Sequence, residues 1–221
     1  NHQIRVEAER DLQFVKKAAA AYGLDFVSGS VDVKAQALES GETLEEAARN
    51  ARYRFLFALA DEKHARAVLT AHQADDQVET ILMNLLRGSG LSGLGGMRVC
   101  STTAYHANIP LVRPLLDCWR EEILEYCRQE SIDFVTDETN QDTVYRRNRI
   151  RLELLPLLGN YNPNIKRSLL NTGRLASEDR ELLEGLLQNS LDECALKIEG
   201  GYGELSLDPF QKFPPALQRY V

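Results

Sequence analysis

Short apolar runs alternate with amphipathic stretches along the first 137 residues, and this alternation limits the fold more than any other feature. The run at 65–71 (ARAVLTA) is typical of a buried strand, because strands covered on both faces have continuous apolar sequence. The expected strands are 24–33, 65–71, 110–112 and 132–135, and the expected helices are 7–22, 44–59, 75–87 and 119–130. Strands that alternate with helices predict an α/β fold with a parallel sheet and helices on both faces.

The rest of the chain is expected to be mainly helical. Helices are predicted at 145–158 and 164–189, broken by Pro156, Gly159 and Pro163, and a hairpin at 195–207. This shift in pattern predicts two domains, 1–158 and 159–221.

Local signals support individual elements. Thr43 and Glu46 form the pattern of a capping box, which predicts that a helix begins at Leu44. The stretch 88–108 begins with a glycine-rich run and is expected to be a long, flexible loop near a substrate.

Composition excludes several classes of protein. Of the 221 residues, 43% are hydrophobic and 27% are charged, which is typical of globular proteins and not of disordered or collagen-like chains. No apolar run is long enough to predict a membrane span, and the start of the sequence has no apolar signal core. The four cysteines form no CxxC pair, which argues against a zinc ribbon or a disulfide framework and favours the cytoplasm.

The charge of the chain is unevenly distributed. A net charge of −7 argues against general binding of nucleic acid. The segment 145–167 is nevertheless basic, with a single acid, Glu153; its basic residues are Arg146, Arg147, Arg149, Arg151, Lys166 and Arg167. Such a segment either holds a polyanion or forms an ordinary solvated helix face, and charge alone does not decide between them.

One segment gathers the side chains best suited to chemistry. The stretch 71–80 (AHQADDQVET) follows an expected parallel strand and opens a helix, which is where open α/β sheets bind ligands. His72, Asp75, Asp76 and Glu79 lie there together. The simplest alternative is that the aspartates only cap the helix. Adjacent carboxylates also suggest Mg²⁺ with a phosphate ligand, for which we select Asp76 and Glu79. A zinc site is a weaker alternative, since no second histidine lies at motif spacing.

Several segments together resemble a known family. The stretch 71–97 (AHQADDQVETILMNLLRGSGLSGLGGM) is similar to the signature of the tRNA(Ile)-lysidine synthetases, which are N-type ATP pyrophosphatases. The segments NHQIR, EEAARNARYRFL and the stretch 111–158 match the same family, so that the resemblance covers about residues 1–170. It implies a Rossmann-like, adenine nucleotide alpha-hydrolase-like sheet, followed here by the start of a helical domain that faces tRNA.

The resemblance also implies a reaction. These ligases use ATP to adenylate the 2-carbonyl oxygen of the wobble cytidine in an isoleucine tRNA with the anticodon CAU, releasing pyrophosphate. The ε-amine of lysine then attacks that carbon and displaces AMP, which forms lysidine. ATP, Mg²⁺, L-lysine and the tRNA are therefore the expected cofactors and partners, and whether the protein forms a homodimer is left open.

The family motifs assign expected roles to particular residues. His72, Asp75 and Asp76 are the expected catalytic residues, with Asp76 orienting Mg²⁺–ATP and the target base. The expected contacts to substrate or tRNA are made by Arg49, Arg52, Arg87, Arg146, Arg147, Asn148 and Arg151. Guanidinium groups suit this role because they pair with phosphates and stack on splayed bases.

One family motif does not occur in the sequence. The phosphate-binding loop Ser-Gly-Gly-x-Asp-Ser is expected upstream of NHQIR, and the glycine-rich run at 88–96 does not replace it because that run follows a helix instead of preceding one. We therefore expect this stretch to be a piece of the enzyme that is inactive by itself. Three alternatives stay open: a non-catalytic RNA-binding fragment, another tRNA-modifying ATP pyrophosphatase such as a thiolase, and a metal-dependent hydrolase.

Overall fold

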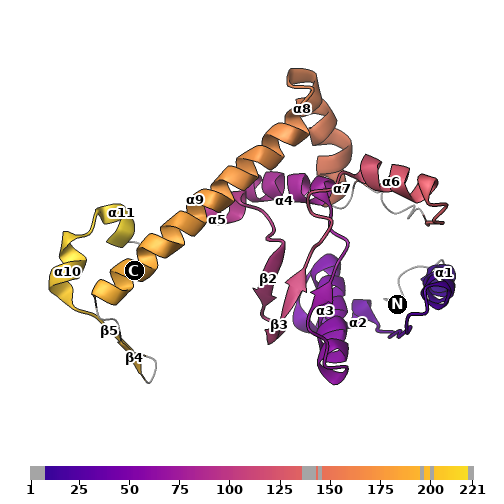
Figure 1. The fold of residues 1–221 in the computed structure, drawn as a ribbon, viewed down its shortest axis with the longest axis horizontal. Helices are drawn as coiled ribbons and strands as arrows, with labels where there is room; N and C mark the ends of the chain where they lie inside the picture. The colour runs from indigo at the N-terminus through magenta and orange to yellow at the C-terminus, as the bar shows by residue number, and fades with distance from the viewer. Residues whose placement is uncertain (1–7, 136–142, 144–145, 195–196, 200–201, 219–221) are drawn as a thin grey trace. The chain divides into compact units, whose positions relative to one another are not determined.

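The chain folds into two compact units, each assembled from two stretches of sequence. The computed structural model describes residues 8–135, 143, 146–194, 197–199 and 202–218. The first unit comprises residues 1–73 and 99–138, and the second comprises residues 74–98 and 139–221. The family resemblance of residues 1–5 lies outside the described residues. Figure 1 shows the elements along the chain.

The first unit contains a three-stranded sheet and four helices among its described residues. Its elements are α1 (Ala8–Ala21), α2 (Val33–Ser40), α3 (Leu44–Glu62), β1 (Val68–Leu69), β2 (Cys100–Thr103), β3 (His106–Val112) and α6 (Arg120–Gln129). The strand order is β1-β3-β2, with β1 parallel and β2 antiparallel to β3. The predicted α/β fold with parallel pairing is therefore confirmed at β1 and β3, whereas β2 makes the sheet mixed.

The core of the first unit lies between α3 and the sheet. It is formed by six buried side chains from α3, β1 and β3: Tyr53, Phe57, Ala60, Val68, Ile109 and Leu111. The capping box predicted for α3 is confirmed, since the Glu46 amide donates to Thr43 Oγ1 (3.3 Å) and the Thr43 amide donates to Glu46 Oε2 (3.1 Å). This cap fixes where α3 begins and therefore which of its side chains face the sheet.

Two predicted strands are wrong, and a third is shorter than expected. Residues 24–32 form no strand, because Asp32 instead caps α2 by accepting a hydrogen bond from the Ala35 amide (3.1 Å). Residues 132–135 also form no strand, and Phe134 is exposed, so this run lacks the burial that its apolar sequence suggested. The strand expected at 65–71 shortens to β1, and the strand expected at 110–112 lengthens to β3.

The second unit is mainly helical in its described part. Its elements are α4 (Ala74–Leu86), α5 (Leu91–Leu94), α7 (Arg146–Arg149), the π-helical turn η2 (Ile150–Leu154), α8 (Leu155–Tyr161), α9 (Ile165–Glu193), β4 (Lys197–Glu199), β5 (Tyr202–Glu204), α10 (Leu207–Lys212) and α11 (Pro215–Gln218). The long helix α9 packs against α4, α5 and α8 (Figure 1). The antiparallel pair β4–β5 confirms the predicted hairpin.

The helix expected to break at Pro156 and Gly159 continues through both residues. A wide turn with a hydrogen bond from the Leu155 amide to the Ile150 carbonyl directly precedes Pro156, which lies in the first turn of α8. Proline is tolerated in the first turn of a helical segment, and the wide turn before it interrupts the regular α-helical hydrogen bonding. The break lies later, between Tyr161 and Ile165.

The stretch 88–108, predicted to be a long flexible loop, is mostly structured. It contains α5, β2 and the start of β3. The side-chain amide of Gln77 holds its centre: Gln77 Nε2 donates to the Met97 carbonyl (2.9 Å), and the Met97 amide donates to Gln77 Oε1 (2.8 Å). Asn84 Nδ2 likewise donates to the Gly93 carbonyl (2.7 Å). The glycine-rich run is therefore fastened to α4. None of the helices described here has the length and apolar character that a membrane crossing requires.

Candidate functional site: an ion-paired carboxylate cluster on helix α4

Helix α4 carries its acidic side chains in its first two turns. Asp75 and Asp76 lie in the first turn, where carboxylates interact favourably with the helix dipole. The opposite face is apolar, with Val78 and Ile81 almost fully buried. Glu79 follows Asp76 by three residues, so the two carboxylates share one face of the helix.

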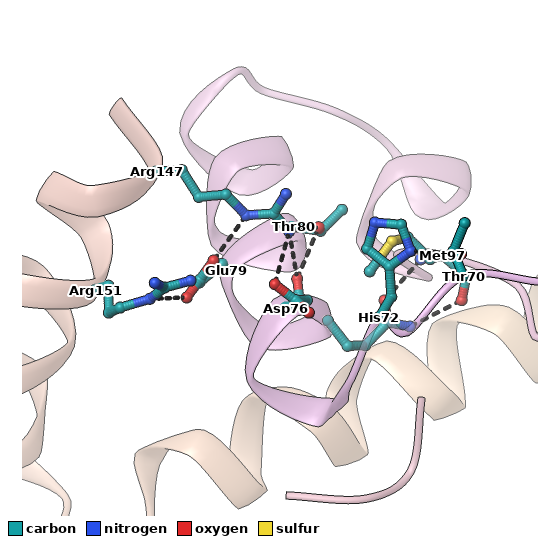
Figure 2. A network of polar contacts seen from close by, with 9 residues as sticks. Thr70, His72, Asp76, Glu79, Thr80, Met97, Arg147 and Arg151 are labelled. Carbon is teal, nitrogen blue, oxygen red and sulfur yellow. Dashed lines mark hydrogen bonds and ion pairs between the residues drawn. The ribbon is translucent and has the colours of Figure 1, made fainter. Parts of the chain in front are cut away.

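Glu79 is buried and bound by two arginines. Its side chain is only 1% exposed. Arg147 Nε donates to one carboxylate oxygen (2.7 Å), and Arg151 Nε donates to the other (2.6 Å), as Figure 2 shows. Both oxygens of Glu79 are therefore engaged, which compensates the cost of burying its charge.

Arg147 extends this network to the start of α4. Its Nη2 donates to the Asp76 carbonyl (3.1 Å) and to Thr80 Oγ1 (3.3 Å), and it lies 3.6 Å from Asp76 Oδ1 (Figure 2). One guanidinium group thus connects Asp76, Glu79 and Thr80. Such a planar, five-donor group is suited to holding several acceptors in a fixed arrangement.

The pKa of Arg151 is raised by the carboxylates of this cluster. Burial lowers the pKa of Arg151, but the hydrogen bond and negative charge of Glu79, together with the charges of Asp76 and Asp75, outweigh burial and raise it above its usual value. The carboxylates of α4 therefore stabilise the charged form of Arg151 more than burial opposes it.

The two arginines come from one helical face. Arg147 lies in α7 and Arg151 in the following π-helical turn η2, four residues later, and Ile150 beside them is buried. Single π-helical turns within helices occur often at functional sites. Here the turn presents both guanidinium groups to the same carboxylate.

Asp75 is paired with a more distant residue. Lys166 Nζ, at the start of α9, donates to Asp75 Oδ1 (2.7 Å). Every acid in the cluster thus has a cationic neighbour within 4 Å. No sequence motif pointed to Lys166; its place in the basic segment 145–167 was the only available signal.

This arrangement fits ion pairing better than metal coordination. Within the described part of the chain, no group of three or more His, Cys, Asp or Glu side chains is placed to hold a metal. Glu79, selected from the sequence as a metal ligand, directs both oxygens at guanidinium groups. Both oxygens of Glu79 are therefore engaged by arginines in this structure, and the assignment of Asp76 and Glu79 to a metal stays a prediction.

His72 belongs to the first unit. Its Nδ1 lies 2.8 Å from Thr70 Oγ1 (Figure 2), directly beyond the end of β1. This contact fixes the ring orientation, and a catalytic role for His72 stays a prediction.

The remaining predicted residues fall into separate places. Arg49 and Arg52 are exposed on α3, with their guanidinium carbons 4.9 Å and 6.0 Å from the centre of the Tyr53 ring. Arg87 is exposed just beyond α4, and Arg146 is exposed on α7, where Asn148 is partly buried. Their contacts with substrate or tRNA stay predictions.

Comparison with known proteins places the chain in a family. A model of the PP-loop domain (ATP_bind_3) matches residues 1–158. A tRNA(Ile)-lysidine synthase from Geobacter sulfurreducens is 39% identical over 220 residues, covering 99% of this chain and 46% of that protein. The enzyme of the same name from Bacteroides thetaiotaomicron is 42% identical over 166 residues, covering 75% of this chain and 37% of that protein. The chain thus spans about half the length of the curated relatives it matches, or less.

A solved structure supports the fold independently. The U34-tRNA thiolase NcsA from Methanococcus maripaludis, described with its [4Fe-4S] cluster, superimposes with a TM-score of 0.61 at 14% identity, over 80% of this chain and 60% of that one. At this identity the likeness shows the fold alone. The family model covers more than half of the chain, and so the chain belongs to the PP-loop domain family.

Proposed function

We propose that the protein containing this chain ligates lysine to the wobble cytidine of an isoleucine tRNA with a CAU anticodon. One observation carries the proposal: nearly the whole chain, including the acidic face of α4, aligns with a protein named tRNA(Ile)-lysidine synthase at 39% identity. The PP-loop domain supplies the ATP-binding part of such an enzyme.

The reaction has two steps. The 2-carbonyl oxygen of the cytosine attacks the α-phosphorus of ATP, which forms an adenylated base and releases pyrophosphate. The ε-amine of lysine then attacks carbon 2, the bond to the adenylate oxygen breaks, and AMP leaves while the attacking nitrogen loses a proton. Both steps depend on orientation and charge stabilisation more than on a protein nucleophile.

Burial separates the roles of the carboxylates on α4. The Glu79 side chain is 1% exposed and is held by two arginines. The Asp76 side chain is 19% exposed, and its contact with Arg147 is longer, at 3.6 Å. Asp76 is therefore the carboxylate better able to reach a substrate amine or base, orienting it and accepting a proton. Asp75 is also partly exposed, but its oxygen is taken by Lys166.

The other assignments are part of the same proposal. Residues 1–158 form part of the catalytic domain, and residues 159–221 begin a helical domain that faces tRNA. ATP acts with Mg²⁺ in the cytoplasm, with L-lysine and tRNA as the partners. We derive no step through the metal, because the carboxylates of α4 are ion-paired.

The test uses the full-length protein with an isoleucine tRNA transcript, ATP and labelled lysine. Wild-type protein is expected to incorporate lysine into the tRNA only when ATP is present. Asp76→Asn is expected to reduce incorporation at least about a hundredfold, the usual effect of removing a general base. Asp179→Asn is the matched control, because Asp179 is exposed on α9 in the same unit.

The outcomes separate the proposal from its alternatives. Full incorporation by Asp76→Asn would contradict the assignment of Asp76. Tight tRNA binding by wild-type protein without any incorporation would favour a non-catalytic RNA-binding module. Metal-dependent release of phosphate without ATP or tRNA would favour a hydrolase, and transfer of sulfur instead of lysine would favour a thiolase.

A further inference from the structure

A threonine hydroxyl lies against the ring of His72 at the end of the first strand. Thr70 directly follows β1, which is parallel to β3, and in α/β sheets ligands bind at the carboxyl ends of parallel strands. Thr70 Oγ1 is 2.8 Å from His72 Nδ1, as Figure 2 shows. Thr70 was not among the residues selected from the sequence, because it lies before the motif at 71–80 and carries no charge.

The sheet holds Thr70 in place. Its amide donates to the Val112 carbonyl (2.9 Å), which continues the pairing of β1 with β3 by one residue. The β-branched side chain of threonine has few rotamers, so that a fixed backbone also restricts the direction of the hydroxyl. Thr70 and His72 are both half-buried, which reduces competition from water for the hydrogen bond between them.

This hydroxyl determines which ring nitrogen of His72 carries hydrogen. A neutral imidazole has one N–H and one acceptor nitrogen, and a hydroxyl can bond to either. Among the residues that the structure describes, His72 Nδ1 is the only hydrogen-bond partner of the Thr70 hydroxyl. Its hydrogen therefore finds an acceptor there only if the hydroxyl donates to Nδ1. The hydrogen of the ring then lies on Nε2, because the bond made by one nitrogen sets the state of the other.

We propose that Thr70 is a positioning residue that keeps the hydrogen of His72 on Nε2. His72 then donates a hydrogen bond to a substrate oxygen that gains negative charge during adenylation, and it does not act as a general base. A fixed N–H directed at such an oxygen stabilises the developing charge, whereas a ring with its hydrogen on Nδ1 would present a lone pair and repel it. This inference rests on the proposed function, since it concerns an expected catalytic residue of that reaction.

The first test measures the tautomer of His72 and needs no lysine transfer. The full-length protein is labelled with ¹⁵N-histidine, and long-range ¹H–¹⁵N correlation spectra distinguish a ring nitrogen that carries hydrogen from one that does not. The His72→Gln variant identifies the His72 signals by removing them. At about pH 9, where histidine is normally neutral, we expect hydrogen on Nε2 and none on Nδ1. Hydrogen on Nδ1 would overturn the proposal.

The second test asks whether the hydroxyl matters for the reaction. Thr70→Val removes the hydroxyl but keeps the shape of the side chain, and it should lower kcat for lysine incorporation about tenfold with KM for lysine unchanged. Thr70→Ser keeps the hydroxyl and should stay within about threefold of wild type. The matched control is Thr102→Val, because Thr102 is exposed on β2 in the same unit, and it should not change kcat.

A double-mutant cycle shows whether Thr70 acts through His72. In the His72→Gln background, Thr70→Val should cause no further loss of kcat, because the ring that the hydroxyl positions is already absent. A further loss of about tenfold in the double variant would overturn the proposal, since that is the size of an independent effect. A Thr70→Ser variant as slow as Thr70→Val would also overturn it.

The two tests separate this proposal from the proposed function. If wild-type protein incorporates no lysine, the proposed function fails, while the spectrum of wild-type protein still decides which nitrogen carries the hydrogen. If Thr70→Val does not fold, the same spectrum decides, because it needs no change at position 70. Hydrogen on Nε2 together with a Thr70→Val variant of wild-type kcat would contradict the positioning role.

Discussion

The carboxylate of Glu79 lies 2.7 Å from the guanidinium of Arg147, although 68 residues separate them in sequence. This contact joins the first helix of the second unit to the basic segment that the sequence had assigned to tRNA. At least two of the arginines in that segment therefore serve an internal carboxylate. The same contact holds Arg147 close to Asp76, the proposed catalytic acid.

Removal of the Glu79 charge should destabilise the second unit strongly. In Glu79→Gln, Arg147 and Arg151 would lose their shared counter-charge in a partly buried site, at a cost of about 3 kcal/mol in the free energy of unfolding. Urea denaturation of the variant measures this cost. The control is Glu178→Gln, whose partner Arg174 is exposed and 3.8 Å away, with an expected cost below about 0.5 kcal/mol. Equal costs for the two variants would contradict an internal role for Glu79.

Neighbouring arginines of the basic segment should behave differently. Arg146 is exposed, and so Arg146→Ala should lower the salt slope of tRNA binding by about one without changing the melting temperature. Arg147 holds Glu79, so that Arg147→Ala should lower both tRNA affinity and the melting temperature. Binding titrations at several salt concentrations, together with thermal melts, distinguish the two. An unchanged salt slope for Arg146→Ala would mean that Arg146 does not contact a tRNA phosphate.

Local signals in the sequence predicted structure well. The cap formed by Thr43 and Glu46 was predictable because its residues are three apart and form the same contacts in any context. The strand expected at 24–33 failed because a competing local signal, the Asp32 cap, begins α2 instead. Which local signal prevails depends on the tertiary partner that each segment finds, and the sequence does not supply that information.

The candidate site was predictable in its residues but not in its pairing. The acids of α4 were identified from one short motif, because they are adjacent in sequence. Lys166, the partner of Asp75, lies 91 residues further along the chain. Arg147, which binds the Asp76 carbonyl, lies 71 residues further along. Such pairings follow from how α7 and α9 pack on the unit. The sequence therefore suggested Glu79 as a metal ligand and did not reveal that arginines bind it.

The contact between Gln77 and the 95–97 segment should depend on glycine at position 96. Gly96 has a φ of +66°, and a Cβ there would lie 2.7 Å from Gln77 Oε1. Gly96→Ala should therefore destabilise the protein by about 2 kcal/mol through backbone strain and a steric clash. Gly90→Ala is the control, because Gly90 has a φ of −72° and open space around it. Urea denaturation measures both, and a Gly96→Ala variant as stable as Gly90→Ala would contradict the rigid attachment of this segment.

The two glycines of α9 should respond to alanine in opposite directions. A Cβ at Gly173 would lie 2.5 Å from Ile81 Cδ1 and 3.2 Å from the Leu94 carbonyl oxygen. Because Ile81 is 1% exposed, its side chain would have to shift within the core, and Gly173→Ala should cost about 1–2 kcal/mol despite the better helix propensity of alanine. Nothing lies within 4 Å of a Cβ at Gly185, and so Gly185→Ala should stabilise the protein by up to about 1 kcal/mol. Thermal and urea unfolding of both variants test this difference. Stabilisation by Gly173→Ala would mean that α9 does not pack closely on α4 and α5. The pairing of Lys166 on α9 with Asp75 on α4 depends on that packing and would then lose its structural basis.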